Sequence, residues 1–356
     1  MKVLITAPSL DENKNVSGIS TLVGQIIKNG KADFFHFQAG RQDDEKGKFD
    51  WIFKQFFLVP RFHRQIKMEN VDLVHINTAL NPLSILRDYA LVKTARFAGR
   101  KIVLHLHGGE FLAREFKSVR LKKLAEKMLQ SANAIIVLSE LEKQIIERRW
   151  RDLNVRVLEN AVSIEEVKPQ KMETPEKTII FLGRLHESKG LHEIIEACRI
   201  LKEENYAFLF RCFGAGELKD FFAAEMTKIL GDKFYYGGVV SGKKKWDELA
   251  ASDIFLLPSR YGEGLPIAML EAMAAQCIVI AADVASVRAV VEDGVNGFLI
   301  EPYNTAQIVS KLKHLLSDEI DWKILQRNAR ATIEEKYAIA DYIKKLESLY
   351  AATISP

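Results

Sequence analysis

The chain has 356 residues, 48% of them hydrophobic, which suffices for two domains of ordinary size with separate cores. Its formal net charge of +4 is too small to indicate a nucleic-acid partner. The three cysteines, Cys198, Cys212 and Cys277, lack ligand-like spacing, so we expect neither disulfides nor a zinc site, as in a reducing cytoplasm. The apolar run after Met1 is too short for a signal peptide, and no run of about 18 apolar residues predicts a membrane span.

Strands and helices alternate in the first half of the chain. Residues 2–7 are predicted to form a buried strand and residues 21–28 a helix, with a polar loop between them that contains Gly18. This order begins a Rossmann-like unit, but Gly-x-Gly-x-x-Gly is absent, which disfavours a dinucleotide. A plain turn is the alternative role for Gly18. Further strands are predicted at 71–76, 101–107 and 134–138.

Two histidines end the strand predicted at 101–107. The strand period of two places His105 and His107 on one face. With Glu110 they offer a metal-ligand set, but so short a stretch would need a strained turn, and we predict no metal site. A structural histidine at a strand end is an alternative reading of His107.

Two stretches combine basic and aromatic residues, at 51–67 and 114–127. Such stretches can lie on an anionic membrane surface, where each basic group adds about 1 kcal/mol. Ordinary amphipathic helices that pack their aromatic side chains inward are the alternative. Our hypothesis is that this half docks on the inner membrane face to meet a lipid-linked acceptor.

A polar segment with two prolines, 166–176, predicts a linker, and a new strand at 178–182 restarts the α/β pattern. The segment that follows this strand, Gly183 to Gly190, contains Arg184 and Lys189 at a strand-to-helix turn. Arginine offers a planar fork and lysine a point charge to phosphate, each charged hydrogen bond contributing about 1.5–3 kcal/mol. Solvated surface charges are the alternative.

Residues 237–243 spell Gly, four residues, Gly-Lys, like the phosphate loop of ATPases. Lys244 follows in place of the Ser or Thr that would hold magnesium, and the first strand of the domain lies elsewhere. We therefore do not predict an ATPase site.

A buried strand predicted at 254–257 breaks at Pro258 into a glycine loop, and Pro266 then begins a helix. Amides at the start of such a helix, at Gly264 and Leu265, favour an anion. Glu263 in the loop and Glu271 inside the helix are separated by seven residues. Carboxylates accept pairs of hydroxyls, as on a sugar and a ribose. For Glu271 the alternative is a solvated helix face, although its neighbours are apolar.

The segment Glu263-Gly264-Leu265-Pro266, followed by Glu271-Ala272-Met273-Ala274, resembles the paired-glutamate motif of retaining glycosyltransferases of family four. The resemblance implies an α/β chain of the GT-B fold, in which two Rossmann-like domains face each other across a cleft. It implies these boundaries: an acceptor-side domain at 1–165, a linker at 166–176, a nucleotide-sugar domain at 177–335, and a helix at 336–356 that crosses back to the first domain.

The resemblance also assigns roles. Arg184 and Lys189 match the residues that hold the donor diphosphate without a metal, and Glu271 is expected to bind the ribose. Gly18 matches a glycine near the phosphates, and Val240 lies where backbone groups contact the base. Asn160 matches at a domain boundary, where the family continues with Gly-Val-Asp and this chain with Ala-Val-Ser.

Catalysis is implied for two residues. His107 matches the histidine that contacts the donor sugar, and Glu263 is expected to bind that sugar's hydroxyls. The implied reaction is retaining transfer of a hexose-type sugar from a nucleotide sugar, UDP by default, without cofactor or metal. The acceptor is a glycan or lipid-linked molecule of bacterial surface polysaccharide assembly, met in the cytoplasm or at its membrane. A nucleotide-sugar epimerase and a non-catalytic nucleotide-sugar-binding protein remain alternatives.

Overall fold

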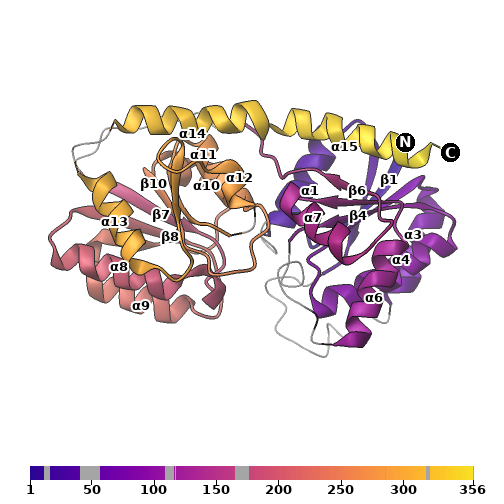
Figure 1. Ribbon diagram of the computed structural model, residues 1–356, viewed down its shortest axis with the longest axis horizontal. Helices are drawn as coiled ribbons and strands as arrows, with labels where there is room; N and C mark the ends of the chain where they lie inside the picture. The colour runs from indigo at the N-terminus through magenta and orange to yellow at the C-terminus, as the bar shows by residue number, and fades with distance from the viewer. Residues whose placement is uncertain are drawn as a thin grey trace. The chain divides into compact units, whose positions relative to one another are not determined.

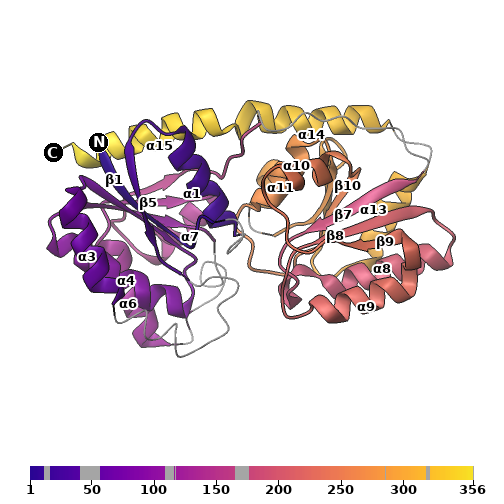
Figure 2. The ribbon, with the colours of Figure 1, turned by 180° about the vertical axis from the view of Figure 1, so that it is seen from behind.

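The structure is a computed structural model. It describes residues 1–11, 17–40, 57–108, 116, 118–164, 176–284, 286–317 and 321–355. The chain folds into two compact units, one made of residues 1–160 together with 339–356, the other of residues 161–338. Figures 1 and 2 show the elements of each unit from opposite sides.

The first unit is built on a parallel sheet with the strand order β2-β1-β3-β4-β5-β6. Its strands are β1 (Lys2–Ala7), β2 (Asp33–Gln38), β3 (Leu73–Thr78), β4 (Lys101–Leu106), β5 (Ala134–Val137) and β6 (Val155–Val157). The central strands are buried along nearly their whole length, as expected for parallel strands covered on both faces.

Helices cover both faces of this sheet (Figure 1). They are α1 (Gly18–Asn29), α3 (Leu58–Glu69), α4 (Pro82–Phe97), α6 (Val119–Gln130), α7 (Glu140–Arg149) and the last helix of the chain, α15 (Ile339–Ile354). On one side α4 packs between α3 and α6, and on the other α15 packs against α1 and β4. The final helix thus belongs to the first unit, where the resemblance places it.

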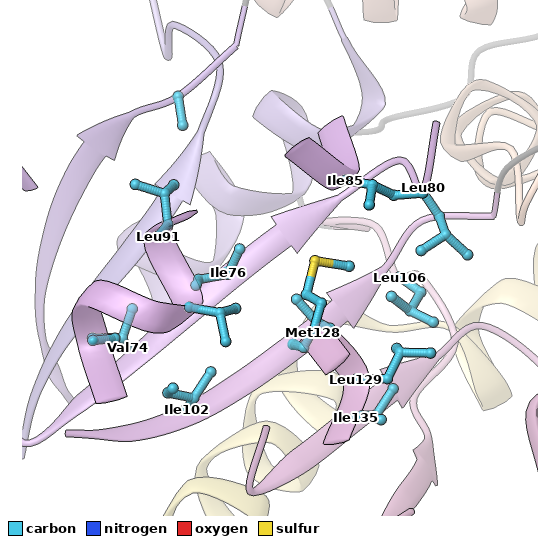
Figure 3. Close-up of a cluster of buried hydrophobic side chains, with 14 of the residues drawn as sticks. Val74, Ile76, Leu80, Ile85, Leu91, Ile102, Leu106, Met128, Leu129 and Ile135 are labelled. Atoms are coloured by element: carbon cyan, nitrogen blue, oxygen red, sulfur yellow. The ribbon is translucent and has the colours of Figure 1, made fainter. Parts of the chain in front are cut away.

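An apolar core fills the space between the sheet and the α3–α4–α6 layer. Figure 3 shows part of it, with Val74 and Ile102 on neighbouring strands and Leu91 and Met128 on the helices above them. These side chains are fully or almost fully buried. Burial of each side chain stabilises this unit by about 1.5–3 kcal/mol relative to an exposed side chain. Together these contributions hold the strand ends of this unit in register.

The second unit repeats the plan, with the strand order β12-β11-β10-β7-β8-β9, again parallel. The strands are β7 (Lys177–Leu182), β8 (Phe208–Phe213), β9 (Phe234–Tyr236), β10 (Ile254–Leu257), β11 (Ile278–Ala282) and β12 (Gly297–Ile300). Two α/β units with parallel sheets are therefore confirmed.

Helices again lie on both faces, with α8, α9 and α13 together on one side and α10, α11 and α14 on the other (Figures 1 and 2). The helical segments are η1 (Glu187–Lys189), α8 (Leu191–Glu203), α9 (Lys219–Leu230), η2 (Gly231–Lys233), α10 (Gly242–Ala250), α11 (Ile267–Ala274), α12 (Val287–Val290), α13 (Thr305–Leu316) and α14 (Trp322–Lys336).

The strand order of the second unit reverses between β7 and β10, which are direct neighbours: Ile179 pairs with Ile254 and Ile180 with Phe255. Parallel α/β sheets bind ligands beyond the carboxyl ends of the strands at such a reversal. The two turns that leave β7 and β10 are the glycine-rich segments that the sequence marks for phosphate and sugar binding. The topology therefore brings the two motifs together.

Several predicted elements differ in their bounds, and two of these differences have a clear cause. The strand predicted at 71–76 begins two residues later, at Leu73, because Asn70 ends α3 in a left-handed conformation and the Val71 amide still donates to the Ile66 carbonyl. Gly18, expected in a loop, is the first residue of α1, because the Ser17 side chain caps the helix by accepting from the Ser20 amide at 3.2 Å.

The predicted linker at 166–176 falls almost wholly outside the described residues. The units divide between Asn160 and Ala161 and again between Ala338 and Ile339. Among the described helices, none is both long enough and apolar enough to cross a bilayer.

One close approach in the second unit gives a stability prediction. Gly190 has φ of +70°, and a Cβ added there would lie 2.1 Å from the Pro258 carbonyl oxygen. We expect Gly190→Ala to lower the free energy of unfolding by about 4 kcal/mol or more, because the backbone after β10 must move. Urea titration of the whole chain measures this.

The matched control is Gly99→Ala. Gly99 has the same φ of +70°, but nothing lies within 4 Å of the added Cβ. It should cost only about 1–2 kcal/mol, the price of the left-handed backbone alone. Equal losses for the two variants would show that the approach of Gly190 to Pro258 is unimportant.

Candidate functional site

The turn after β7 and the turn after β10 are locked together by their backbones. The Arg260 amide donates to the Ser188 carbonyl at 2.7 Å, and Gly190 lies directly against the Pro258 carbonyl. Any side chain at position 190 would separate the turns. Lys189 and Glu263, one from each turn, are 74 positions apart in the sequence, yet the fold brings their side chains together.

Arg260 reinforces this junction with its side chain. Its guanidinium donates to Glu193, near the start of α8, at 2.9 Å, and to Glu187 at 3.3 Å. Glu193 is buried, so this ion pair is fixed in position, unlike a surface pair. Arg260 was not among the predicted site residues, and the structure gives it a role in joining the two turns.

Charged groups of the two turns also meet directly. The Lys189 ammonium, from the turn after β7, forms an ion pair with Glu263 Oε1, from the turn after β10. The buried Ser259 hydroxyl donates to the same oxygen at 2.6 Å. Both contacts use Oε1, which leaves Glu263 Oε2 without a hydrogen-bond partner within the described part of the chain. Glu263 is thus held in place with one oxygen available to accept hydroxyl groups.

The start of α11 adds positive character to the same place. Pro266 occupies the N-cap position, and no side chain caps the helix. The amides around Gly264 and Leu265 and the first turn of α11 therefore point toward the loop with the partial positive charge of a helix start. An anion placed here would lie beside Lys189.

Arg184 follows β7 directly and is exposed. No ion pair to Arg184 is formed by any residue that the structure describes. Its neighbours are anchored, since the Gly183 amide donates to the Phe213 carbonyl and the Leu185 amide to the Ala215 carbonyl. The turn is therefore ordered while its guanidinium stays available to a ligand.

Glu271 is buried inside α11, with its side chain 5% exposed, which rules out the solvated helix face. It pairs with Lys245 Nζ of α10 at 2.5 Å, and the Lys245 side chain is only 10% exposed. Lys245 was not among the predicted site residues. Its spacing of four from the apolar Leu249 is the one signal that sets it apart from Lys243 and Lys244.

The lysine of the ATPase-like segment is placed differently. Lys243 lies in the first turn of α10, 87% exposed at its side chain, and pairs with Asp247 at 2.7 Å. This is a solvated helix pair, so the geometry gives no support to a phosphate loop here.

Val240 lies in the loop between β9 and α10 with its side chain buried. The predicted contact of its main chain with the base stays a prediction. A nearby turn is tightly packed: a Cβ on Gly214, where φ is +137°, would lie 1.8 Å from the Gly183 carbonyl oxygen, and Tyr236 donates to the Gly214 carbonyl at 2.6 Å.

His75, His105 and His107 lie together at β3 and β4, with His75 and His105 fully buried and His107 partly exposed. His75 Nδ1 and the Tyr350 hydroxyl lie 2.5 Å apart, and His75 Nε2 lies 3.3 Å from His105 Nδ1. His107 Nε2 lies 2.6 Å from Asn77 Oδ1. Burial lowers the pKa of His75 and of His107 to about 3, so both are neutral at physiological pH.

These contacts bear on the other predicted sites of the first unit. His105 Nδ1 faces His75, and His107 Nε2 faces Asn77. Among the residues that the structure describes, no group of side chains could hold a metal ion. Glu110 lies outside those residues. Gly18 is exposed at the start of α1, where the Ser17 side chain accepts from the Ser20 amide.

Comparison with known families matches both units. The model of the family described as glycosyl transferases group 1 matches residues 163–332, and that of Glycosyltransferase Family 4 matches residues 45–166. Together they span most of the chain.

Similar proteins agree with this. UDP-Gal:alpha-D-GlcNAc-diphosphoundecaprenol alpha-1,3-galactosyltransferase of Escherichia coli is 28% identical over 316 residues, 81% of this chain and 77% of that protein. Among solved structures, HepE of Anabaena in complex with UDP-glucose has a TM-score of 0.80 at 18% identity, covering 99% of this chain and all (100%) of HepE. Sucrose-phosphate synthase of Thermosynechococcus elongatus gives 0.80 at 15% identity, covering 99% and 98%. The structural likeness establishes the GT-B fold.

The buried pair in α10 and α11 gives the second prediction. Lys245→Met leaves the Glu271 carboxylate buried without its ammonium, so we expect the free energy of unfolding to fall by about 3–5 kcal/mol. Lys243→Met, which removes an exposed lysine two residues away, should change it by less than about 0.5 kcal/mol. Denaturant titration compares the two.

The double variant Lys245→Met, Glu271→Gln separates the charge from the packing. It should recover most of the loss, because no uncompensated charge stays buried. If Lys245→Met proves as mild as Lys243→Met, the pair is not structurally important.

Proposed function

Since the chain belongs to the glycosyltransferases of family 4, we propose that it is a retaining, metal-independent enzyme that transfers a hexose-type sugar from a UDP-sugar to a glycan or lipid-linked acceptor. The observation that carries this proposal is the junction of the two turns after β7 and β10. There Lys189 and the uncapped start of α11 lie beside the fixed carboxylate of Glu263, and Arg184 is exposed in the same turn as Lys189.

The positive groups of this junction fit a diphosphate. Lys189 and Arg184 offer a point charge and a planar fork, and the amides at Gly264 and Leu265 add fixed dipoles. As the bond from sugar to phosphate breaks, negative charge develops on the leaving diphosphate. Preorganised donors stabilise this charge without reorganising, which is the work a metal ion does in other transferases. The proposal of a metal-independent reaction rests on this arrangement.

Carboxylates on either side of the diphosphate fit the two sugars of the donor. We assign the ribose hydroxyls to Glu271, whose position Lys245 fixes, and the hydroxyls of the transferred sugar to Glu263 through its available Oε2. The main chain at Val240 is assigned to the base, and Gly18 to the approach of backbone to the phosphates. His107 is assigned to a hydroxyl of the transferred sugar.

In the proposed step the acceptor hydroxyl oxygen bonds to the anomeric carbon as the bond from that carbon to the phosphate oxygen breaks. The electron pair leaves with UDP, and the acceptor proton passes to the departing phosphate oxygen on the same face. Glu263 Oε1 is occupied by Lys189 and Ser259, which suits binding more than nucleophilic attack. A same-face route of this kind retains the anomeric configuration.

Names of similar proteins support the choice of donor and acceptor. The E. coli relative uses UDP-galactose and a sugar linked to diphosphoundecaprenol, and HepE binds UDP-glucose. We therefore propose UDP as the nucleotide and bacterial surface polysaccharide assembly as the process. Membership in the glycosyltransferase family disfavours both the epimerase and the non-catalytic binding protein.

We also propose that the enzyme works at the inner face of the cytoplasmic membrane. On α3, Arg61, Arg64 and Lys67 are exposed beside Met68, which is 67% exposed, whereas Phe62 is buried as an ordinary amphipathic helix requires. Phe57, before the helix, and Phe97, at the end of the adjoining α4, are 53% and 87% exposed.

On α6 the exposed residues include Val119, Arg120, Lys122, Lys123 and Lys127. Residues 51–56, 114, 115 and 117 of the two predicted stretches lie outside the described residues.

The function is tested by incubating the chain with a panel of nucleotide sugars and a lipid-diphosphate N-acetylglucosamine acceptor in EDTA. We expect acceptor-dependent release of UDP, and a product whose anomeric configuration, read by NMR, equals that of the donor. Arg184→Ala should lower kcat/KM about 100-fold or more, as loss of one transition-state donor does. Arg327→Ala, an exposed arginine on α14, should have no effect.

Other outcomes would contradict particular parts. Consumption of the donor without acceptor would indicate an epimerase, and binding without turnover a non-catalytic protein. Loss of all activity in EDTA, restored by magnesium, would contradict metal independence. An inverted anomeric centre would contradict the same-face step.

Membrane docking predicts binding to vesicles that contain anionic lipid and weaker binding to neutral ones. Reversing Arg61, Arg64 and Lys67 to glutamate should weaken binding by about 100-fold or more, because each basic group adds about 1 kcal/mol. The control replaces Lys202, Lys228 and Lys336 by glutamate, which gives it the same net charge as the α3 variant. Co-sedimentation that is indifferent to lipid charge would refute the docking surface.

A further inference from the structure

We infer that Asn77 is a positioning residue that fixes the tautomer of His107, so that His107 presents an unprotonated Nδ1 to a hydroxyl of the bound sugar. The inference rests on the proposed function for the identity of the ligand, but the tautomer itself follows from contacts within the first unit. Asn77 is the fifth residue of β3 and is buried.

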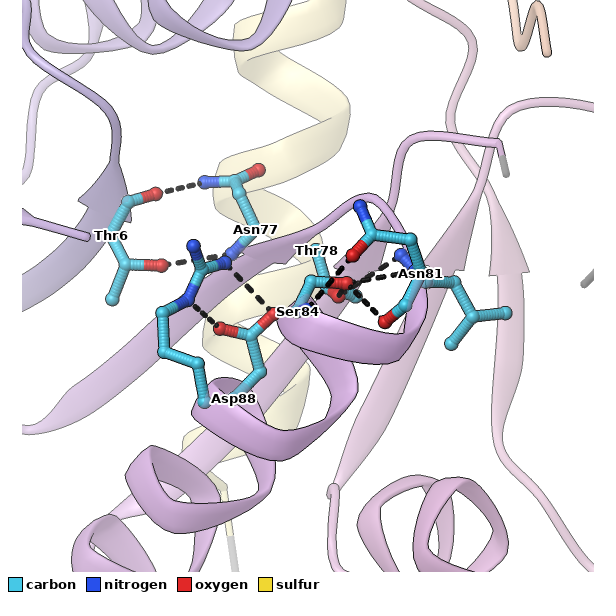
Figure 4. Close-up of polar contacts among 8 residues, drawn as sticks. Thr6, Asn77, Thr78, Asn81, Ser84 and Asp88 are labelled. Carbon is cyan, nitrogen blue, oxygen red and sulfur yellow. Dashed lines mark hydrogen bonds and ion pairs between the residues drawn. The ribbon is translucent and has the colours of Figure 1, made fainter. Parts of the chain in front are cut away.

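The orientation of the Asn77 amide is decided by its other neighbour, Thr6 of β1. Asn77 Nδ2 lies 2.7 Å from the Thr6 carbonyl oxygen, and the Asn77 backbone amide donates to the Thr6 hydroxyl at 3.0 Å (Figure 4). A carbonyl can only accept, so the amide group that faces Thr6 must be NH₂. The Asn77 oxygen is therefore the atom that faces His107.

The proton on His107 follows from that orientation. Its Nε2 lies 2.6 Å from Asn77 Oδ1, which can only accept. Nε2 must therefore carry a hydrogen, and in the neutral ring Nδ1 carries none. Burial lowers the pKa of His107 to about 3, which keeps the ring neutral at physiological pH.

The remaining nitrogen of His107 is then an acceptor. His107 Nδ1 has no hydrogen-bond partner in the part of the chain that the structure describes, and the side chain is partly exposed. It can accept from a hydroxyl but cannot donate to a phosphate oxygen. The site thus selects a sugar hydroxyl at this point and adds no positive charge.

Nearby titratable groups oppose a charged His107. His75 and His105 lie in the adjoining strands, and a charge on His107 lowers the pKa of both. Tyr350, from α15, contacts His75 and not His107. The cluster therefore favours one neutral form of His107, and Asn77 selects its tautomer.

The test is the tautomer itself, read from imidazole ¹⁵N shifts of the whole chain labelled at histidine, without ligand. We expect His107 to have a protonated Nε2 and an unprotonated Nδ1. Asn77→Ala should mix the tautomers. Asn77→Asp should raise the pKa of His107 into the range of the titration, because a carboxylate favours the imidazolium. Mixed tautomers in the wild type, or unchanged shifts in Asn77→Ala, would overturn the inference.

Asn81→Ala is the matched control for folding. Asn81 caps α4 by accepting from the Ser84 amide at 2.9 Å, four residues beyond Asn77. Its loss should lower the unfolding temperature and leave the His107 shifts unchanged. If Asn77→Ala fails to fold, Asn77→Asp and the wild-type shifts still decide the tautomer.

The link to the sugar is tested with deoxy analogues of the donor. Asn77→Ala should lower kcat/KM about tenfold for the full donor, which is the loss of about one hydrogen bond. The deoxy analogue that lacks the hydroxyl contacted by His107 should react equally with the wild type and the variant. If His107 has the expected tautomer but no deoxy analogue reacts equally with both proteins, the proposed contact with the sugar is wrong. If the chain has no transferase activity, the proposed function is wrong and the tautomer result still holds.

Discussion

The approach of Gly190 to the Pro258 carbonyl is the constraint on which the site depends. Gly190 ends the turn after β7 and Pro258 begins the turn after β10, and these neighbouring strands are where the order of the second sheet reverses. Only a glycine leaves room for the two backbones to meet at this distance. Because they meet, the Arg260 amide reaches Ser188, and Lys189 reaches Glu263. The two turns that are predicted to bind phosphate and sugar thereby become one surface.

The carboxylates around this surface are each held by an ion pair. Each carboxylate that is predicted to bind the donor has a cationic partner that belongs to another element: Lys189 for Glu263 and Lys245 for Glu271. Such pairs cost desolvation, and breaking one partner costs more than the pair gains. Their value lies in orientation, since a carboxylate held in advance binds hydroxyl groups without losing freedom on binding. The Lys189 ammonium also has further N–H groups that can donate hydrogen bonds to a phosphate.

Sequence patterns predicted much of this. Apolar strands, glycine turns and the position of Pro266 were enough to predict two α/β units and to single out Glu263, Glu271, Arg184 and Lys189. Only its spacing of four from Leu249 distinguishes Lys245 from the two lysines before it, and its burial depends on how α10 packs on α11. The contacts of Asn77 with Thr6 and of Arg260 with Glu193 join residues 71 and 67 positions apart, and no local pattern records them.

The most direct measurement is calorimetric titration of the whole chain with UDP in EDTA, for the wild type, Lys189→Met and Lys228→Met. Lys228 is an exposed lysine of α9 in the same unit and serves as the control. We predict that the wild type and the Lys228 variant bind UDP without a metal, and that Lys189→Met weakens binding about tenfold or more, as loss of a charged hydrogen bond does. Unchanged binding by Lys189→Met, or binding that requires a divalent cation, would contradict the assignment of the junction as a diphosphate site.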